Sequence, residues 1–271
     1  MQPSPEIIVC AIGDVVGRAG RQYLSEKIED IRSIYNPDIF IVNGENSAGG
    51  FGITDKIFRH YTQELAIDVV TTGNHWHDKD EILKTKPFPS NLLLPANMYN
   101  VETITQGFGL FTTKKKDHSF AVINLLGRLF MKGQNRCPFA YADEILTKIP
   151  KDIKTIIVDF HAETTSEKQA LAHYLSGRVS LLYGTHTHCP TADERIIDAK
   201  TGYITDLGMT GAFDSVIGMR KASSLPFFLS GERRRQEPAE GDPWLCGLIA
   251  TINPKSGYCT KVDRLLLKKR E

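Results

Sequence analysis

The fold is decided near the start of the chain, by the stretch Glu6-Ile-Ile-Val-Cys-Ala-Ile12 and the Gly13-Asp14 pair that follows it. The stretch is short, apolar and rich in β-branched residues, which is typical of a strand buried on both faces in a parallel sheet. It stops abruptly at a glycine and a carboxylate. We therefore predict a buried strand over residues 6–12 that ends at a functional edge of the sheet.

The same alternation of strand and helix continues along the chain. Apolar residues recur at helical spacing over residues 18–35, which predicts a helix directly after the first strand. A strand over residues 39–42, a helix over residues 55–65 and a strand over residues 69–72 follow. Such β-α-β units imply a largely parallel sheet that is covered by helices.

The middle of the chain begins with a different pattern. Residues 108–112 and 120–126 flank a charged turn that is too short to hold a helix, and this predicts a β-hairpin. Strands over residues 155–160 and 179–183, with a helix over residues 167–175 between them, then resume the β-α-β pattern.

The C-terminal third is rich in strands and poor in long helices. We expect residues 203–205, 245–252 and 258–267 to complete a second, more antiparallel sheet. Residues 226–243 combine proline, glycine and charge, and this composition predicts an exposed loop. Since no change of composition marks a linker, we expect residues 1–271 to form a single domain.

Composition excludes several classes of protein. With 41% hydrophobic and 24% charged residues, the 271-residue chain has average globular usage, and a formal net charge of +1 gives duplex nucleic acid no basic surface to hold. No apolar run approaches the roughly 20 residues that span a membrane. Five cysteines without a C-x-x-C pair indicate a reducing compartment rather than a disulfide framework. We therefore expect a cytoplasmic protein that contacts neither duplex nucleic acid nor membrane.

Residue types that bind metals follow five of the predicted strands at their carboxyl ends. Because these ends line one edge of a parallel sheet, residues far apart in sequence meet there. Each residue alone has a plainer explanation, since a carboxylate or amide can cap a helix and a histidine can pack in the core. The convergence of the whole set predicts a metal site. Its members are Asp14, Glu45, Asn46, Asn74, His75, His161, His186 and His188.

The donor types also indicate which metals the site would hold. Carboxylates, amides and imidazoles together suit Mn, Fe or Zn better than Mg or Ca. The set is too large for one four-coordinate ion, but it suffices for two ions that share a carboxylate. Two ions about 3.5–4 Å apart lower the pKa of water held between them, which phosphoester hydrolysis requires.

Several longer motifs carry a family resemblance. With Gly13-Asp14, Gly73-Asn74-His75 and Gly184-Thr-His-Thr-His188 in this order, the chain resembles the calcineurin-like metallophosphoesterases. Ile12-Gly-Asp-Val-Val-Gly-Arg18, Val42-Asn-Gly-Glu-Asn46, Asp159-Phe-His-Ala-Glu163 and Asp206-Leu-Gly-Met-Thr-Gly211 are similar to the YmdB-type bacterial phosphodiesterases among them. The resemblance implies a four-layer α/β/β/α sandwich and hydrolysis of small phosphodiesters such as 2′,3′-cyclic nucleotides.

The resemblance also implies roles for individual residues. Two divalent or mixed-valence transition-metal ions, Fe first with Mn or Zn as alternatives, would be bridged by Glu45. A hydroxide between the ions would attack phosphorus, and His75, the catalytic histidine, would assist the leaving group. Apart from the resemblance, Asp159 and Glu163 could orient imidazoles or form ordinary surface ion pairs, and the sequence does not decide between these roles. The family's metal-ligand positions fall on Asp14, Glu45, Asn46, Asn74, His161, His186 and His188.

Two positions depart from the patterns that the resemblance implies. Metallophosphoesterases at large begin with Asp-x-His, but residue 16 here is Val, and Asn46 would take the place of the absent imidazole. Trp76-His77-Asp78 adds an imidazole that the YmdB type does not usually have. We expect a helix to begin at Trp76 and to turn His77 away from the site.

Two other functions remain to be weighed. A metal-binding regulatory protein could sense nucleotide without significant turnover, but such a protein needs no proton donor beside its ligands. An amidohydrolase normally carries its His-x-His after the first strand rather than near residue 186. We therefore favour a phosphodiesterase with a small nucleotide substrate. The sequence leaves open whether the chain forms a homo-oligomer, and whether Gly208 to Gly218 forms a pocket wall or a subunit contact.

Overall fold

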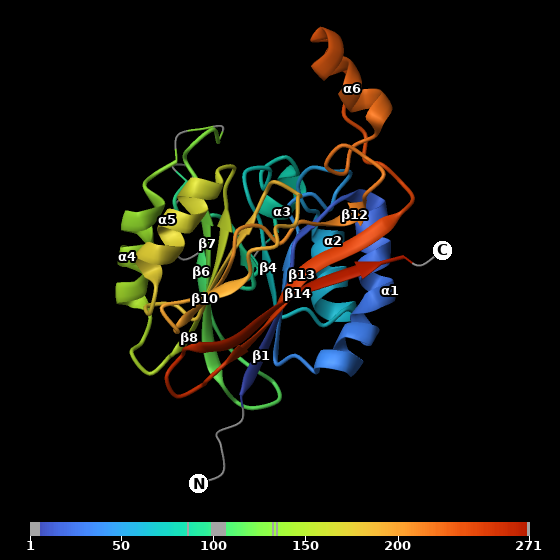
Figure 1. The fold of residues 1–271 in the computed structure, drawn as a ribbon. Coiled ribbons are helices and arrows are strands. Elements are labelled where there is room, and N and C mark those ends of the chain that lie inside the picture. The colour runs from blue at the N-terminus through green and yellow to red at the C-terminus, as the bar shows by residue number, and fades with distance from the viewer. Residues whose placement is uncertain (1–5, 86, 99–106, 132, 134, 270–271) are drawn as a thin grey trace.

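The computed structural model describes residues 6–85, 87–98, 107–131, 133 and 135–269, and two β-sheets packed face to face form its centre (Figure 1). Within these residues the first sheet has eight strands, in the order β2-β12-β13-β1-β3-β4-β5 with β14 beside β13. The second has six strands, in the order β10-β11-β9-β8-β7-β6.

Bounds of the first sheet's strands are β1 Ile7–Ile12, β2 Asp14–Val15, β3 Ile39–Asn43, β4 Val69–Thr71, β5 Leu92–Leu93, β12 Met209–Ala212, β13 Pro243–Ile252 and β14 Cys259–Lys268. Bounds of the second sheet's strands are β6 Phe108–Thr112, β7 Ser119–Leu126, β8 Thr155–His161, β9 Leu181–Thr185, β10 Arg195–Ile197 and β11 Thr201–Ile204. The helices are α1 Gly17–Tyr35, α2 Asp55–Arg59 with the π-helical turn η1 His60–Glu64, α3 Asp80–Leu83, α4 Pro138–Lys148, α5 Thr165–Leu175 and α6 Lys221–Ser230.

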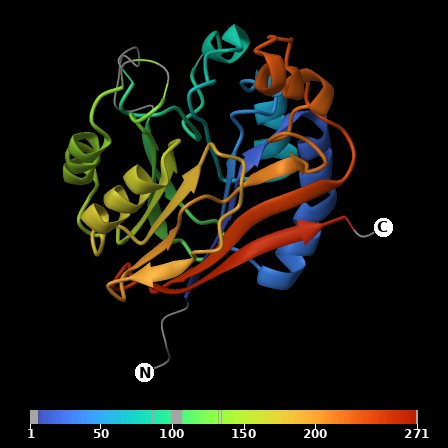
Figure 2. The ribbon, with the colours of Figure 1, turned by 45° about the horizontal axis from the view of Figure 1, so that its top comes forward.

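Successive side chains of a strand point to opposite faces of its sheet, and each face packs against a different layer. In β1, Val9 and Ala11 pack into the core between the two sheets, whereas Cys10 and Ile12 pack into the core that faces α1. A strand buried on both faces needs apolar residues at every position, which is why the opening stretch has no polar alternation. In Figure 2, α1 covers one flank of the molecule and α4 and α5 cover the opposite flank. The predicted four-layer α/β/β/α sandwich is confirmed.

Parallel strands bring the predicted strand ends to one edge of the sandwich. β1 pairs in parallel with β3, and β3 with β4, in the first sheet. β8 pairs in parallel with β9 in the second sheet. The carboxyl ends of these five strands therefore lie together, where the two sheets meet.

The expected place of the C-terminal strands was wrong in part. β11 does join the second sheet, but β13 and β14 return to the first, and β13 lies antiparallel to β1. The physical reason is burial of both faces of β13. Leu248 and Ala250 pack between the sheets, and Leu245 and Ile249 pack on the side of α1.

Part of the loop expected over residues 226–243 is helical instead. α6 runs through Pro226, a residue that usually breaks a helix because it has no N–H and crowds the carbonyl four residues before it. That carbonyl belongs to Ala222, and Arg234 Nη1 donates to it at 3.3 Å. The arginine thus satisfies the acceptor that the proline cannot. Residues 231–237 are irregular, as expected.

Membrane-spanning helices were not expected. Within the described part of the chain, every helix is too short or too polar to cross a bilayer.

A buried ion pair between α5 and the segment after β11 supports the loop that follows β9. Lys168 Nζ on α5 lies 2.6 Å from Asp206 Oδ2, and both side chains are almost fully buried. Asp206 also accepts hydrogen bonds from the backbone N–H groups of Thr187, at 3.2 Å, and Gly208, at 2.8 Å. The pair therefore helps to fix the backbone of the loop after β9, which carries His186 and His188.

Replacing Lys168 by methionine would leave the Asp206 carboxylate buried without its charged partner. We expect the free energy of unfolding of the metal-free chain to fall by about 3–5 kcal/mol, as when one side of a buried ion pair is removed. Urea unfolding in the presence of a chelator, followed by circular dichroism, measures this loss.

Lys148→Met provides the matched control, because it removes the exposed pair of Lys148 with Glu144. Exposed pairs contribute about 0–1 kcal/mol, so this variant should unfold close to wild type. Equal losses in the two variants would contradict the role given to the buried pair.

Candidate metal centre

All eight residues expected at the strand ends lie at the edge where the carboxyl ends of the strands meet. Asp14 follows β1, the Glu45-Asn46 pair follows β3 and the Asn74-His75 pair follows β4. His161 is the last residue of β8, and the two histidines of the segment His186 to His188 follow β9. Loops, not helices, carry most of these side chains.

A chain of hydrogen bonds fixes the His161 ring. Asp159 Oδ1 accepts from the Thr185 hydroxyl at 2.7 Å, and its Oδ2 accepts from Asn43 Nδ2 at 3.1 Å and also from Thr71. The single proton of the Thr185 hydroxyl is thereby committed to Asp159. Consequently His161 Nδ1, 3.0 Å from Thr185 Oγ1, must be the donor to that oxygen. The other ring nitrogen of His161, Nε2, is left with a lone pair.

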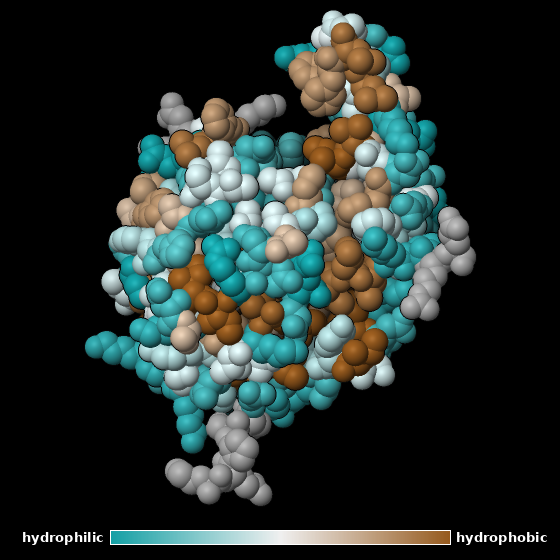
Figure 3. All heavy atoms as spheres, viewed as in Figure 1, coloured by the Kyte–Doolittle hydropathy of each residue, from teal (hydrophilic) through white to brown (hydrophobic). Residues whose placement is uncertain are grey.

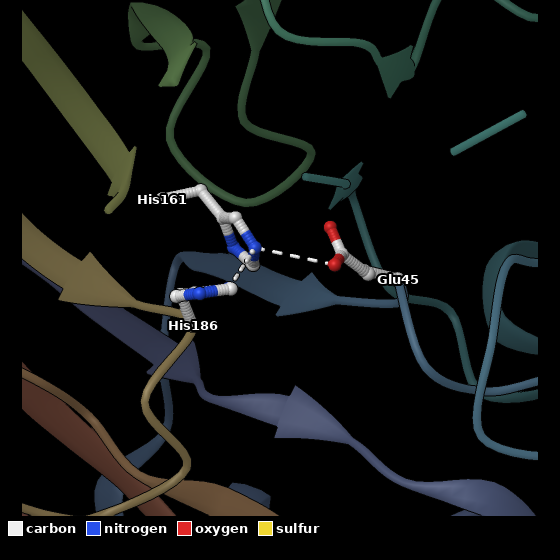
Figure 4. Close-up of side chains that lie close together, drawn as sticks. All are labelled: Glu45, His161 and His186. Carbon is white, nitrogen blue, oxygen red and sulfur yellow. Dashed lines mark hydrogen bonds and ion pairs between the residues drawn. The ribbon is translucent and has the colours of Figure 1, made fainter. Parts of the chain in front are cut away.

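That lone pair points at other acceptors. His161 Nε2 lies 3.2 Å from Glu45 Oε1 and 3.2 Å from Asn74 Oδ1. His186 Nδ1 lies 3.0 Å from the same nitrogen, and Figure 4 shows the two rings and the Glu45 carboxylate turned toward one another. Among the described residues, ligand atoms of Glu45, His161 and His186 all lie within 4.8 Å of one another. A proton can relieve one of these contacts, whereas a cation relieves them all.

His186 reaches the cluster through a constrained loop. Its Nε2 lies 2.9 Å from Glu163 Oε2, which accepts the ring N–H and leaves Nδ1 facing His161. Its backbone N–H donates to Asp14 Oδ2 at 3.0 Å. The backbone φ angle of His186 is 98°, in a region that residues with side chains rarely adopt. Strain of this kind persists where the surrounding structure fixes a functional side chain.

A second group of acceptors surrounds His188. The Ile217 carbonyl can only accept, so His188 Nδ1, at 2.8 Å, donates to it, and His188 Nε2 keeps the lone pair. This Nε2 lies 3.3 Å from Asn46 Oδ1 and 4.0 Å from Asp14 Oδ1. Asn46 Nδ2 donates to the Gly50 carbonyl at 3.0 Å, which keeps the amide oxygen turned toward His188. Here too the acceptor atoms face one another.

Burial opposes charge throughout the cluster. It raises the pKa of Asp14 and that of Glu45 to about 7. It lowers the pKa of His161 to about 4 and that of His186 to about 2, so these imidazoles are neutral at pH 7. Asp14 Oδ1 and Glu45 Oε2 are buried without a hydrogen-bond partner. Neutral imidazoles beside orphaned carboxylate oxygens fit the donor set of divalent transition metals.

Gly73 makes room for the cluster. A Cβ at this position would collide with Glu45 Oε2 and with the ring of His161. The glycine before Asn74 therefore has a steric reason, since any side chain would push the carboxylate and the imidazole apart.

His75 lies at the rim of the cluster, in an adjoining cavity. Its Nδ1 lies 2.8 Å from Asp78 Oδ2, and its side chain is 31% exposed. The ring of Phe51 packs edge-on against it, with centroids 5.0 Å apart. The cavity has a volume of about 510 Å³ and is lined on this side by Glu45, Asn46, His75, His186 and His188.

The helix expected to begin at Trp76 does not form there. Residues 74–77 make a turn, closed by the Asp78 N–H donating to the His75 carbonyl at 3.0 Å, and α3 begins only at Asp80. The buried Trp76 anchors this turn. The His77 side chain is 57% exposed, and His77 is not among the residues that line the cavity. The segment Gly208 to Gly218 contributes Val216 and Ile217 to the cavity wall.

Comparison with known proteins matches residues 10–265 to the model of a family described as YmdB-like protein. The chain belongs to the YmdB-like protein family. A 2′,3′-cyclic-nucleotide 2′-phosphodiesterase of Bacillus subtilis is 41% identical over 256 residues, which cover 94% of this chain and 95% of that protein.

Two solved structures share the fold of this chain. A crystal structure of a phosphatase from Mycoplasma pneumoniae superposes with a TM-score of 0.89 at 32% identity, covering 97% of this chain and 94% of that one. A crystal structure of a hypothetical protein from Thermus thermophilus gives a TM-score of 0.87 at 32% identity, covering 97% of this chain and all, 100%, of that one. This chain therefore shares its fold with both of these proteins along nearly its whole length.

Thr185 was missed by the sequence reasoning. Its hydroxyl connects Asp159 to His161 and so sets which nitrogen of the imidazole faces the cluster. A threonine directly before the two histidines is the signal that could have found it. The pairing itself depends on the register of β8 and β9, which places His161 opposite Thr185.

Replacing Thr185 by valine keeps the shape of the side chain but removes the acceptor for His161 Nδ1. We expect the affinity for Mn²⁺ to fall about 10- to 100-fold, the usual effect of removing a group that orients a metal ligand. Titration calorimetry of the metal-free chain measures it. Thr185→Ser keeps the hydroxyl and should bind within a few-fold of wild type. The same loss in both variants would show that packing, rather than the hydrogen bond, is responsible.

Proposed function

We propose that this chain is a phosphodiesterase that uses two metal ions to hydrolyse small phosphodiesters, 2′,3′-cyclic nucleotides first among them. One observation carries the proposal: in each of two groups, one around His161 and one around His188, acceptor atoms lie against one another without a donor between them. Two cations would satisfy both groups. The name of the Bacillus subtilis relative, which is similar along nearly the whole chain, supports the choice of substrate.

Each group of acceptors would hold one ion. His161, His186 and Asn74 lie together in the first group, and His188 and Asn46 in the second. Asp14 Oδ1 lies 4.0 Å from His188 Nε2, and Asp14 Oδ2 accepts from the backbone N–H of His186, so this carboxylate is beside both groups. Glu45 has one oxygen beside His161 and the other unpartnered, so it is suited to bridge the ions. Fe, Mn and Zn all accept this mixture of imidazole and oxygen ligands.

When bound, such ions would polarise the phosphoryl oxygens and lower the pKa of water. The chain supplies the rest of the chemistry. His75 Nδ1 donates to Asp78 Oδ2, which orients the ring, and in the protonated imidazole this leaves the Nε2 proton available for transfer. As water adds to phosphorus and releases a proton to solvent, the bond to O2′ would break, His75 would transfer its Nε2 proton to O2′, and the product would be a nucleoside 3′-monophosphate. A sensor that only binds nucleotide would not need this histidine and carboxylate beside its ligands.

Substitution of Glu45 tests the bridge. We expect Glu45→Ala to bind less than one ion per chain, because both ions lose the ligand that they share. Asn74→Ala should keep the ion beside His188 and therefore retain about one ion per chain. Elemental analysis of protein loaded with Mn²⁺ or Fe²⁺ and freed of excess metal measures this. Equal metal contents in the two variants would count against Glu45 as a bridge.

Substitution of His75 separates chemistry from metal binding. His75→Ala should keep both ions but lose turnover of 2′,3′-cyclic AMP by about 10²–10⁴-fold, the contribution of a positioned proton donor. His77→Ala is the matched control, two residues away and exposed, and it should change kcat by less than about tenfold. Steady-state kinetics and metal analysis on the same preparations decide the matter. A His75→Ala variant of near wild-type activity would reject the assignment.

A further inference from the structure

The end of α6 carries apolar side chains that no core covers. Within the described residues, Phe228 is 72% exposed and Leu229 is 82% exposed, and Phe227 is about half-exposed. α6 stands out from the edge of the sandwich (Figure 1), and the space-filling view shows apolar residues gathered on the protruding helix (Figure 3). Large exposed apolar surface usually marks a binding site.

This aromatic surface is continuous with the candidate metal centre. Phe227 and Phe228 line the same cavity as His75, His186 and His188, which gives the cavity a polar wall and an apolar wall. The volume of about 510 Å³ lies within the range of about 300–1,000 Å³ that small-molecule sites occupy. The apolar wall consists of Phe51, Val216, Ile217, Met219, Phe227 and Phe228.

Polar contacts, not an apolar core, hold α6 over the cavity. The Ser224 hydroxyl donates to Gln236 Oε1 at 2.8 Å, and Gln236 Nε2 donates to the Ser223 carbonyl at 3.0 Å. The guanidinium of Arg233 lies 6.0 Å from the centre of the Phe227 ring. These contacts position the helix, and they leave the Phe228 ring 72% exposed beside the cavity.

We propose that Phe227 and Phe228 form the wall that receives the base of the nucleotide substrate. The inference rests on the proposed function, because it takes the anionic end of the substrate to lie at the metal centre. A nucleotide joins one phosphate to one planar aromatic ring, and the cavity joins one cluster of metal ligands to one aromatic wall. The two ends of the substrate thus match the two walls of the cavity.

Stacking also determines what kind of selectivity the wall can provide. Aromatic rings stack on every nucleobase, since every base presents a π-face, so all four bases should be accepted. The ring lies away from the reacting phosphorus, and binding there is equal in the ground state and in the transition state. Loss of a ring should accordingly raise KM and leave kcat nearly unchanged.

The test compares two esters that differ only in the base. Adenosine 2′,3′-cyclic phosphate is measured against methyl ribofuranoside 2′,3′-cyclic phosphate, which has a methoxy group in place of adenine. We expect Phe228→Ala to raise KM for the adenosine ester by about 5- to 150-fold, the effect of losing one base stacked on one ring. Hydrolysis of the ester without a base should not change.

Matched variants complete the experiment. Phe228→Tyr keeps the ring and should keep the preference for the adenosine ester. Leu229→Ala removes the more exposed neighbour, which does not line the cavity, and should also behave as wild type. An unchanged preference in Phe228→Ala would overturn the wall while leaving the proposed function in place. Absence of turnover on both esters in the metal-loaded wild-type chain would instead overturn the proposed function.

Sedimentation of the same proteins tests whether α6 instead forms a contact between copies of the chain. We expect wild type and Phe228→Ala to have the same mass in solution. A lower mass for the variant, with parallel loss of activity on both esters, would assign the helix to a contact between copies of the chain and overturn the proposal.

Discussion

One electrostatic constraint governs the edge where the carboxyl ends of the strands meet: acceptor atoms that cannot bond to one another are held close together there. His161 Nε2 and His188 Nε2 keep lone pairs because their other ring nitrogens donate to Thr185 and to the Ile217 carbonyl. When the carboxyl groups opposite them are ionised, neither the carboxylate nor the amide oxygens have a proton to share. Such an arrangement is costly unless cations occupy it, and this cost is the physical basis of the proposed metal centre.

The surrounding fold offsets the free-energy cost of holding these acceptor atoms close together. Parallel strands of both sheets place the candidate ligands along one edge of the sandwich. Two of these ligands, on the loop after β9, have strained backbones, with φ angles of 98° for His186 and 63° for His188. The buried pair of Lys168 and Asp206 fixes this loop, and Gly73 leaves space beside Glu45. Stability of the surrounding layers thus holds the ligands in an arrangement that they would not adopt alone.

Local sequence patterns were sufficient to predict most of the strands and the convergence of their carboxyl ends. The apolar stretch before Asp14 and the motif before His188 indicated strands, and parallel pairing then implied that their ends converge. The sequence did not reveal the sheet that β13 joins, because a strand buried on both faces can enter either sheet. It also concealed α6, since Pro226 favours a loop until Arg234 is seen to satisfy the freed carbonyl. Contacts between distant residues decided both cases.

Anomalous diffraction from crystals of the Mn²⁺-loaded chain would locate the bound ions. If each group of acceptors holds one ion, we expect two peaks about 3.5–4 Å apart, one beside His161 Nε2 and the other beside His188 Nε2, with the Glu45 carboxylate between them. A single peak, or two peaks that leave either of these nitrogens without a metal neighbour, would contradict this arrangement.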